Sequence, residues 1–343
     1  MFAEKTYVRT FLILSSGLVL VFMVNLMLGS VHIPFSQVVK SLTGTEIENQ
    51  SWQYIVKNYR LPKAITAVIV GSGLGLSGLL MQTLFRNPLA GPFVLGISSG
   101  ASLGVAFLIM GAGLIGGLAS DVLTSNWSLV IASSLGSFLV LLAVMVVSVR
   151  VRDTMAILII GLMFASLTAA VVSVLSYFAT AEELQQFIFW GFGSLGNLAW
   201  KEISVLLIFY ILGCILCLVS IKALNSFLLG ENYSRSMGLN LKKSRIIIIL
   251  ATSILAGSIT AFAGPIAFIG LAIPHLARQL FNTSAHAILF PAILLIGAII
   301  MLICDSIAQL PFTDYSLPIN AITSIFGAPL VIWLLVRKRK MIF

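Results

Sequence analysis

Few side chains in this sequence are placed for covalent or metal chemistry. Cys214 and Cys217 have the spacing of a redox or zinc pair, but they lie in an apolar run with no histidine or third cysteine nearby, so a structural role is favoured. Residues 96–100, GISSG, match the nucleophile pattern of serine hydrolases, yet that pattern needs a strand before the serine and an acid and a histidine elsewhere. The sequence therefore predicts neither catalytic residues nor a metal site.

Glycine motifs for nucleotide binding are also missing. The chain contains no G-x-x-x-x-G-K-[ST] and no Gly-Lys pair, which excludes a P-loop. Residues 71–75, GSGLG, fail the dinucleotide pattern because Leu76 stands where a third glycine is required. Gly96, Gly100 and Gly104 are instead spaced by four, which predicts a helix face that another helix can approach closely.

One polar break interrupts the apolar sequence in LFRNPLAGP. Pro88 and Pro92 lack a backbone donor and disfavour helix in the residues before them. One interpretation is an ordinary cytoplasmic turn marked by Arg86. The other is a constriction at the cytoplasmic mouth of a pore, formed by the Asn87 amide and Leu89, because irregular backbone at membrane depth must be buried or line a cavity.

A second polar segment, residues 222–245, is amphipathic. Apolar residues alternate with polar ones, and Gly230 and Gly238 are expected to separate two short helices. A helix lying on the membrane surface and a docking surface for a cytoplasmic partner are both consistent with this pattern.

Apolar runs that could hold these segments in place extend along the whole chain. The 343 residues are 59% hydrophobic and 9% charged, against about 25% charged residues in soluble domains, and the mean hydropathy is +1.10. An apolar run near 20 residues can cross the roughly 30 Å hydrocarbon core. Ten candidate spans are 11–29, 62–85, 93–110, 128–149, 155–178, 203–221, 246–262, 265–273, 287–308 and 319–336. The eighth lies between Pro265 and Pro274, is too short to cross alone, and is expected to be a broken or half-length helix.

The basic residues give the expected topology. With the N-terminus inside, fifteen of the twenty lie in inner segments, including Arg150, Arg152 and the tail at 337–340. The five outer ones are Lys40, Lys57, Arg60, Lys63 and Lys201. Lysine and arginine accumulate on the cytoplasmic side, so both termini are expected in the cytoplasm. The net charge of +9 then reflects flanking charges and not a nucleic-acid partner. The first apolar run is interpreted as a transmembrane helix and not as a cleavable signal peptide.

A second broken segment, residues 263–280, begins on the opposite side from the first. This is expected if spans two to five and seven to ten are inverted repeats within one domain, 1–343. An ion-coupled secondary transporter would suit the same pattern. Such proteins usually carry buried carboxylates, and here Asp305 is the one acid well inside a span, with Gln309 as a candidate amide partner.

Residues 60–104, RLPKAITAVIVGSGLGLSGLLMQTLFRNPLAGPFVLGISSGASLG, resemble the signature of FecCD-type permease subunits of ABC importers for iron chelates, haem and vitamin B12. The stretches LLGENYSRSMGLN, GPIAFIGLAIPHLAR and SLPINAITSIFGAPLVIWLL are similar to the remaining motifs of that family, in the same order.

The resemblance implies an all-α permease of the type II importer fold in a bacterial inner membrane. It would pair with a second copy of itself and would not be an enzyme. ATP and Mg²⁺ would bind two separate cytoplasmic ATPase subunits, and a periplasmic or lipid-anchored substrate-binding protein would dock on the outer side. The substrate class is expected to be an iron siderophore or haem, with cobalamin as the alternative.

The same resemblance assigns roles to three groups of residues. Those matching the motifs are Arg60 and Lys63 for docking of the binding protein, Asn87, Pro88 and Leu89 for a cytoplasmic gate, and Gly230, Glu231, Ser236 and Gly238 for coupling to the ATPase. Two positions depart from the family pattern, because Gln309 replaces an arginine and Asn320 replaces a glycine. The first removes one basic contact that the resemblance implies with the binding protein, and the second puts a larger side chain at the start of the last span.

Overall fold

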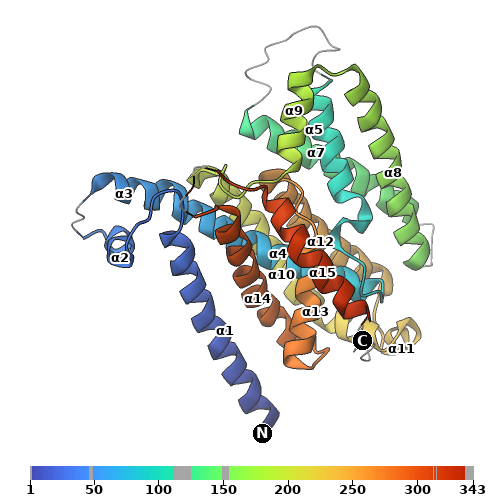
Figure 1. Cartoon of the computed structure of the whole chain (residues 1–343). Helices are drawn as coiled ribbons and strands as arrows, with labels where there is room; N and C mark the ends of the chain where they lie inside the picture. The colour runs from blue at the N-terminus through green and yellow to red at the C-terminus, as the bar shows by residue number, and fades with distance from the viewer. Residues whose placement is uncertain are drawn as a thin grey trace.

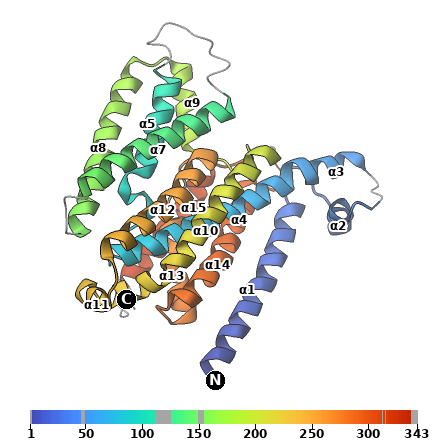
Figure 2. The ribbon, with the colours of Figure 1, turned by 180° about the vertical axis from the view of Figure 1, so that it is seen from behind.

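The structure is a computed structural model that describes residues 2–45, 49–111, 125–148, 154–311, 313 and 315–336. Within these ranges every regular element is a helix, which confirms the all-α class (Figures 1 and 2). The basic residues Arg150 and Arg152 and the tail at 337–340 lie outside the described residues.

Long apolar helices dominate the described chain. Seven of them are long and apolar enough to cross a membrane, and Ile97–Ile109 and Ile319–Trp333 are shorter apolar helices. The protein is therefore a multi-span membrane protein, while the count of ten crossings stays a prediction. The elements are α1 (Phe2–Met27), α2 (Phe35–Thr43), α3 (Gln50–Ile55), η1 (Val56–Arg60), α4 (Leu61–Leu84), η2 (Pro92–Leu95), α5 (Ile97–Ile109), α7 (Asn126–Ser148), α8 (Thr154–Phe178), α9 (Ala181–Gly191), α10 (Trp200–Leu228), α11 (Glu231–Ser236), α12 (Leu241–Ala263), α13 (Ile269–Phe281), α14 (His286–Ala308) and α15 (Ile319–Val336).

Helix α4 is the centre of the molecule. Helix α4 ends the continuous helical stretch Gln50–Leu84, and 89% of the apolar part of this stretch is buried, against 11% for α1. Helices α10, α12, α13 and α14 pack around α4 (Figures 1 and 2). Glycines allow this close packing. A Cβ at Gly71 would lie 2.1 Å from the Gly297 carbonyl of α14, and one at Gly78 would lie 1.6 Å from the Gly270 carbonyl of α13. The small residues of α4 therefore serve helix contact and not nucleotide binding.

Helices α5, α7, α8 and α9 form a second group beside the first (Figure 1). A Cβ at Gly100 would meet the Gly136 carbonyl at 2.5 Å, and one at Gly104 the Ala132 carbonyl at 2.0 Å, so both glycines admit α7 as expected. Gly96 has a different role. Its φ of 76° lies in the left-handed region and joins η2 to α5, a conformation that favours glycine.

Two predicted segments differ from the structure, one in its bounds and one in its number of helices. The half-length helix at 265–273 is displaced to α13, which continues through Pro274 to Phe281. Proline removes one intrahelical hydrogen bond, to the carbonyl four residues earlier, and need not end the helix. That carbonyl belongs to Gly270 and packs against Gly78. The second error is in 222–245, where residues 222–228 continue α10, residues 241–245 begin α12, and α11 is the one separate helix.

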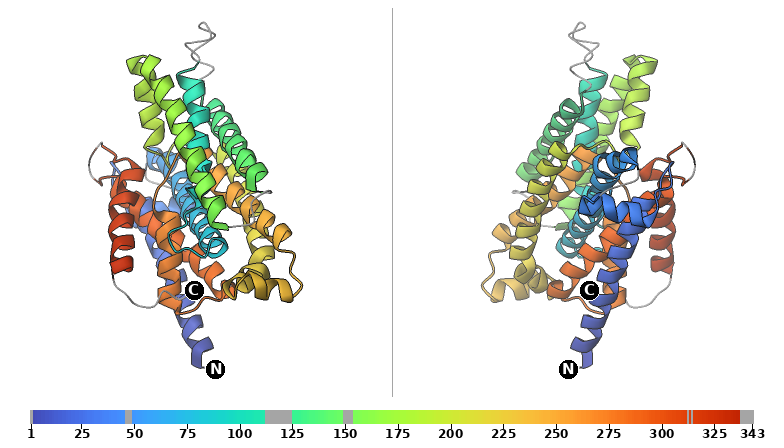
Figure 3. Two further views of the ribbon diagram at one scale, coloured as in Figure 1. Left: turned by 90° about the vertical axis from the view of Figure 1, so that its right-hand side faces the viewer. Right: turned by 90° about the vertical axis from the view of Figure 1, so that its left-hand side faces the viewer.

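The described ends of the chain lie on the same side of the molecule. The start of α1, the end of α15 and α11 are at one end, here called the α11 end, whereas α2, α3 and α9 are toward the other, here called the α3 end (Figures 1 and 3). Both ends of α4 carry residues singled out in the sequence, Lys63 at the α3 end and the turn after Leu84 at the α11 end.

Candidate functional site

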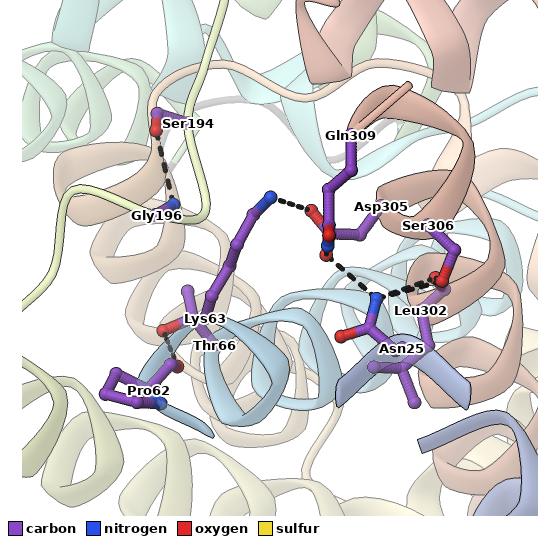
Figure 4. A network of polar contacts seen from close by, with 10 residues as sticks. All are labelled: Asn25, Pro62, Lys63, Thr66, Ser194, Gly196, Leu302, Asp305, Ser306 and Gln309. Atoms are coloured by element: carbon purple, nitrogen blue, oxygen red, sulfur yellow. Dashed lines mark hydrogen bonds and ion pairs between the residues drawn. The ribbon is translucent and has the colours of Figure 1, made fainter. Parts of the chain in front are cut away.

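At the α3 end of α4, a buried carboxylate joins three helices (Figure 4). Lys63 Nζ lies 3.0 Å from Asp305 Oδ1, with the Lys63 side chain 24% exposed and the Asp305 side chain 2% exposed. The other oxygen, Oδ2, accepts hydrogen bonds from Asn25 Nδ2 at 2.9 Å and from Gln309 Nε2 at 2.7 Å. The expected amide partner Gln309 is confirmed, and α1, α4 and α14 are tied together.

Arg60 lies in η1, one turn before Lys63, and is buried. Its Nη1 donates to the carbonyls of Leu26 and Met27, each at 2.8 Å, and its Nη2 donates to the carbonyl of Val31. A guanidinium satisfied by backbone carbonyls holds the connection between α1 and α2 in place. In this structure Arg60 is therefore a positioning residue, and its role in docking stays a prediction.

Beside these residues is an open cavity of about 630 Å³ at the α3 end. Lys63, Asp305 and Gln309 line it together with aromatic side chains that include Tyr59 and Phe192. The partly exposed Lys63 side chain is therefore accessible to a partner through the cavity. Arg60 also lines the cavity, but its guanidinium is already hydrogen-bonded to backbone carbonyls.

At the α11 end, α4 is followed by a tight turn, here called the 85–91 turn. Arg86 has a φ of 47° in the left-handed region. Its N–H donates to the Thr83 carbonyl at 3.2 Å, and the Asn87 N–H donates to the Gln82 carbonyl at 3.1 Å. The Asn87 side-chain oxygen accepts from the Leu89 N–H at 2.9 Å. The turn is therefore fixed to the last turn of α4, and Leu89, 45% exposed, projects from it.

Helix α13 holds the same turn from another side. His275 Nε2 donates to the Pro88 carbonyl at 2.9 Å. Buried Gln82 donates through Nε2 to the Leu271 carbonyl at 3.1 Å and accepts at Oε1 from Arg278 Nη1 at 2.6 Å. Sequence reasoning did not single out these α13 partners, because their only local signal is a polar residue in an apolar helix.

Helix α11 lies next to the turn. Gly230, which precedes α11, has a φ of 102°, and a Cβ on it would lie 3.8 Å from Arg86 Nη1. Gly238 beyond α11 has a φ of 80°. Tyr233 in α11 and Met237 directly after it are exposed, so this segment presents large side chains outward. Glu231 and Ser236 are the first and last residues of α11. The structure therefore places the predicted coupling residue Gly230 beside Arg86, in the turn that holds the predicted gate residues, and places Arg60 and Lys63 at the opposite end.

No group of three potential metal-ligating side chains occurs among the residues that the structure describes. The cysteines are free, with Cys217 and Cys304 buried. What the geometry offers is a bundle of apolar helices with two polar clusters and a short exposed helix beside a structured turn.

These features define a helical membrane protein whose central helix has a polar cluster at each end. The profile of the FecCD transport family matches residues 17–337, and the chain belongs to this family of ABC importer permeases of the metal-chelate type. It is 34% identical over 326 residues to the haemin transport system permease protein HmuU of Yersinia pestis, covering 94% of this chain and 96% of the relative. It is 36% identical to the vitamin B12 import system permease protein BtuC of Klebsiella pneumoniae, covering 84% of each chain. A solved structure of an inward-facing transporter assigned to the metal-chelate type is 28% identical, with a TM-score of 0.81 over 96% of this chain and 99% of the other.

Proposed function

We propose that this permease carries a haem or iron-siderophore complex into the cytoplasm, driven by ATP that a separate ATPase hydrolyses. The observation that carries the proposal is the position of Arg86, which directly precedes the predicted gate residues, beside Gly230 of the predicted coupling segment: its Nη1 lies 3.8 Å from where a Cβ on Gly230 would stand. A partner that moves α11 would act directly beside the turn that follows α4.

The ATPase would dock at the α11 end. The supporting features are the exposed Leu229, Tyr233 and Met237, which a soluble partner could cover. Both termini would then be cytoplasmic, since the start of α1 lies at the same end (Figure 3). For residues 222–245, a docking surface for a partner is preferred to a helix lying on the membrane. Helix α11 has only six residues, and the glycines on either side of it, Gly230 and Gly238, have positive φ angles. It is therefore too short to bury an extended apolar face in lipid.

A second copy of the chain would complete the transport path. Apolar side chains remain exposed along α8, among them Ile159, Met163 and Leu167, and along α15, among them Ile325 and Phe326. A symmetric dimer would cover part of these faces and lipid the rest, with the path along the dimer axis.

The substrate-binding protein would dock at the α3 end. Lys63 is the candidate docking cation that the 630 Å³ cavity makes reachable. Charge pairing across such an interface sets orientation and encounter rate. Arg60 would contribute by holding the α1–α2 connection that borders the same cavity.

Haem or a siderophore is preferred to cobalamin because the haemin permease is matched over a larger share of both chains than the vitamin B12 permease. An ion-coupled secondary transporter is not supported. The chain belongs to an ABC permease family, and the carboxylate of Asp305 is already paired with Lys63.

Uptake into liposomes tests this proposal. The permease would be reconstituted with its ATPase and its binding protein and offered haemin, a ferric siderophore or cobalamin, with and without ATP inside the compartment that holds the ATPase. Uptake of haemin or the siderophore that requires ATP is the expected result. ATP-dependent uptake of cobalamin alone would contradict the substrate assignment, and uptake driven by an ion gradient without ATP would contradict the mechanism.

A further inference from the structure

His286 is the first residue of α14 and is 1% exposed. It contacts two other helices at the α11 end. Its Nδ1 lies 2.7 Å from Asn225 Oδ1 of α10, and the same oxygen accepts from the His286 backbone N–H at 3.1 Å. Its Nε2 lies 2.9 Å from Thr83 Oγ1 of α4. These three side chains, Asn225, His286 and Thr83, are here called the His286 bridge.

The hydrogen-bond directions in the bridge follow from its chemistry. A carboxamide oxygen only accepts, so Nδ1 of His286 carries a proton and donates to Asn225. The neutral ring then accepts at Nε2 from the Thr83 hydroxyl. Every polar atom of the imidazole is used, and the ring orientation is fixed from both sides, which ties α10 and α4 to the start of α14.

The bridge joins the coupling segment to the 85–91 turn. Asn225 is in the last turn of α10, directly before Gly230 and α11. Thr83 is in the last turn of α4, and its carbonyl accepts from the Arg86 N–H. A shift of the end of α10 therefore displaces Asn225, and through His286 it acts on the residue that anchors the turn.

We infer that His286 is a positioning residue that transmits movement of α11 to the 85–91 turn and so couples the ATPase to the gate. The inference rests on the proposed function, because it needs α11 to bind the ATPase and the turn to be the gate. It adds a specific route, through Asn225 and His286 to Thr83, that neither the roles assigned from the family motifs nor the proposed docking surface include.

A matched pair of substitutions in α4 tests the route. Thr83→Val removes one hydroxyl and almost no volume. Thr66→Val is the control, because Thr66 is equally buried on the same helix, yet its hydroxyl bonds only to the Pro62 carbonyl at 2.9 Å within α4 (Figure 4). Both variants lose one buried hydroxyl bond, and only the first loses a bond to another helix.

The readout is the exposure of a cysteine on the turn. In the complex with its ATPase, Leu89→Cys would be labelled with a charged maleimide, first without nucleotide and then with ATP and vanadate. The Thr66→Val background is expected to keep the nucleotide-dependent change in labelling rate. The Thr83→Val background is expected to reduce that change about three- to tenfold, while ATPase association is unchanged.

Two outcomes would overturn the inference, and they differ in what else they remove. Equal nucleotide-dependent changes in the Thr83→Val and Thr66→Val backgrounds would exclude the bridge and leave the gate in place. A parent Leu89→Cys complex whose labelling ignores nucleotide would exclude the gate assignment, and with it the bridge. Asn225→Leu provides a second variant, and its effect should not add to that of Thr83→Val, because residues on one route give non-additive losses.

Discussion

The two ends of α4 are held by buried polar contacts of different kinds. At the α3 end, Lys63 and Asp305 form an ion pair whose remaining oxygen is satisfied by amides from α1 and α14. The two charged partners there, Lys63 and Asp305, both belong to helices. At the α11 end, Gln82 and Thr83 bond both to neighbouring helices and to the backbone of the 85–91 turn.

This difference indicates how one helix can serve two purposes. A charge pair within a fully bonded cluster favours a single arrangement, because breaking it leaves a charge without a partner. At the α11 end, Arg278 bonds to the uncharged Gln82 and not to an acid, and the contacts of the His286 bridge join uncharged groups, which cost less to exchange. The α3 end is therefore suited to anchorage, and the α11 end to movement. Three predictions on stability follow from this packing.

The largest effect on stability is expected at Gly78. In Gly78→Ala, the added Cβ would lie 1.6 Å from the Gly270 carbonyl of α13, and backbone must shift to admit it. We expect a loss of about 3 kcal/mol in the free energy of unfolding, measured by denaturation in detergent micelles. Hydrogen exchange should rise in the 85–91 turn and not at Lys63, because α13 contacts the former. Gly17→Ala is the control, since nothing lies within 4 Å of its Cβ position. Equal stability of the two variants would contradict the packing described.

The next effect is expected at Asp305. Asp305→Ala removes the acceptor of the Lys63 ammonium and of the Gln309 amide, while the Asn25 amide keeps the Ser306 hydroxyl as an acceptor. It should lower the free energy of unfolding by about 2 kcal/mol, less than for a fully buried pair because Lys63 is partly exposed. Asp305→Asn retains one carbonyl oxygen as an acceptor and should lose less. If the alanine variant proves as stable as the parent protein, the α3 end is not anchored by this pair.

The smallest effect is expected at Asn320. Its Oδ1 accepts from the Ala267 N–H at 3.0 Å, joining the start of α15 to the break before α13. Asn320→Gly should cost about 1 kcal/mol, measured by the same unfolding assay. Ser324→Ala is the control, because the Ser324 hydroxyl bonds only within its own helix, to the Asn320 carbonyl at 2.6 Å. A glycine variant no less stable than the control would show that the side chain is dispensable there.

The sequence predicted the long helices well because their apolar runs are continuous. The predicted spans 155–178, 287–308 and 319–336 differ from α8, α14 and α15 by at most one residue at each bound. The predicted helix ended before Pro274, whereas α13 continues through this residue. A proline inside a helix removes one hydrogen bond, here to the Gly270 carbonyl. The helix is retained because Gly270 still packs against Gly78 of α4.

The sequence indicated which segments contain polar breaks, but it did not predict which of these segments lie side by side. The turn around Asn87 and the segment around Gly230 were identified from proline and glycine signals, but their proximity depends on how distant helices pack. The partners of Lys63 and Arg60 were missed for the same reason. Asp305 lies far along the chain from Lys63, and backbone carbonyls, which bind Arg60, carry no sequence signal.

The central claim is that α11 is where the ATPase acts on the permease. Replacing residues 231–236 with a Gly-Ser segment of equal length leaves α10 and α12 intact, because those helices end and begin outside this range. The decisive measurement is co-purification of the ATPase with this variant, together with ATP-dependent uptake by the reconstituted complex. We expect both to be lost while the permease itself remains folded and monodisperse. An ATPase that still co-purifies and still drives uptake would contradict the claim.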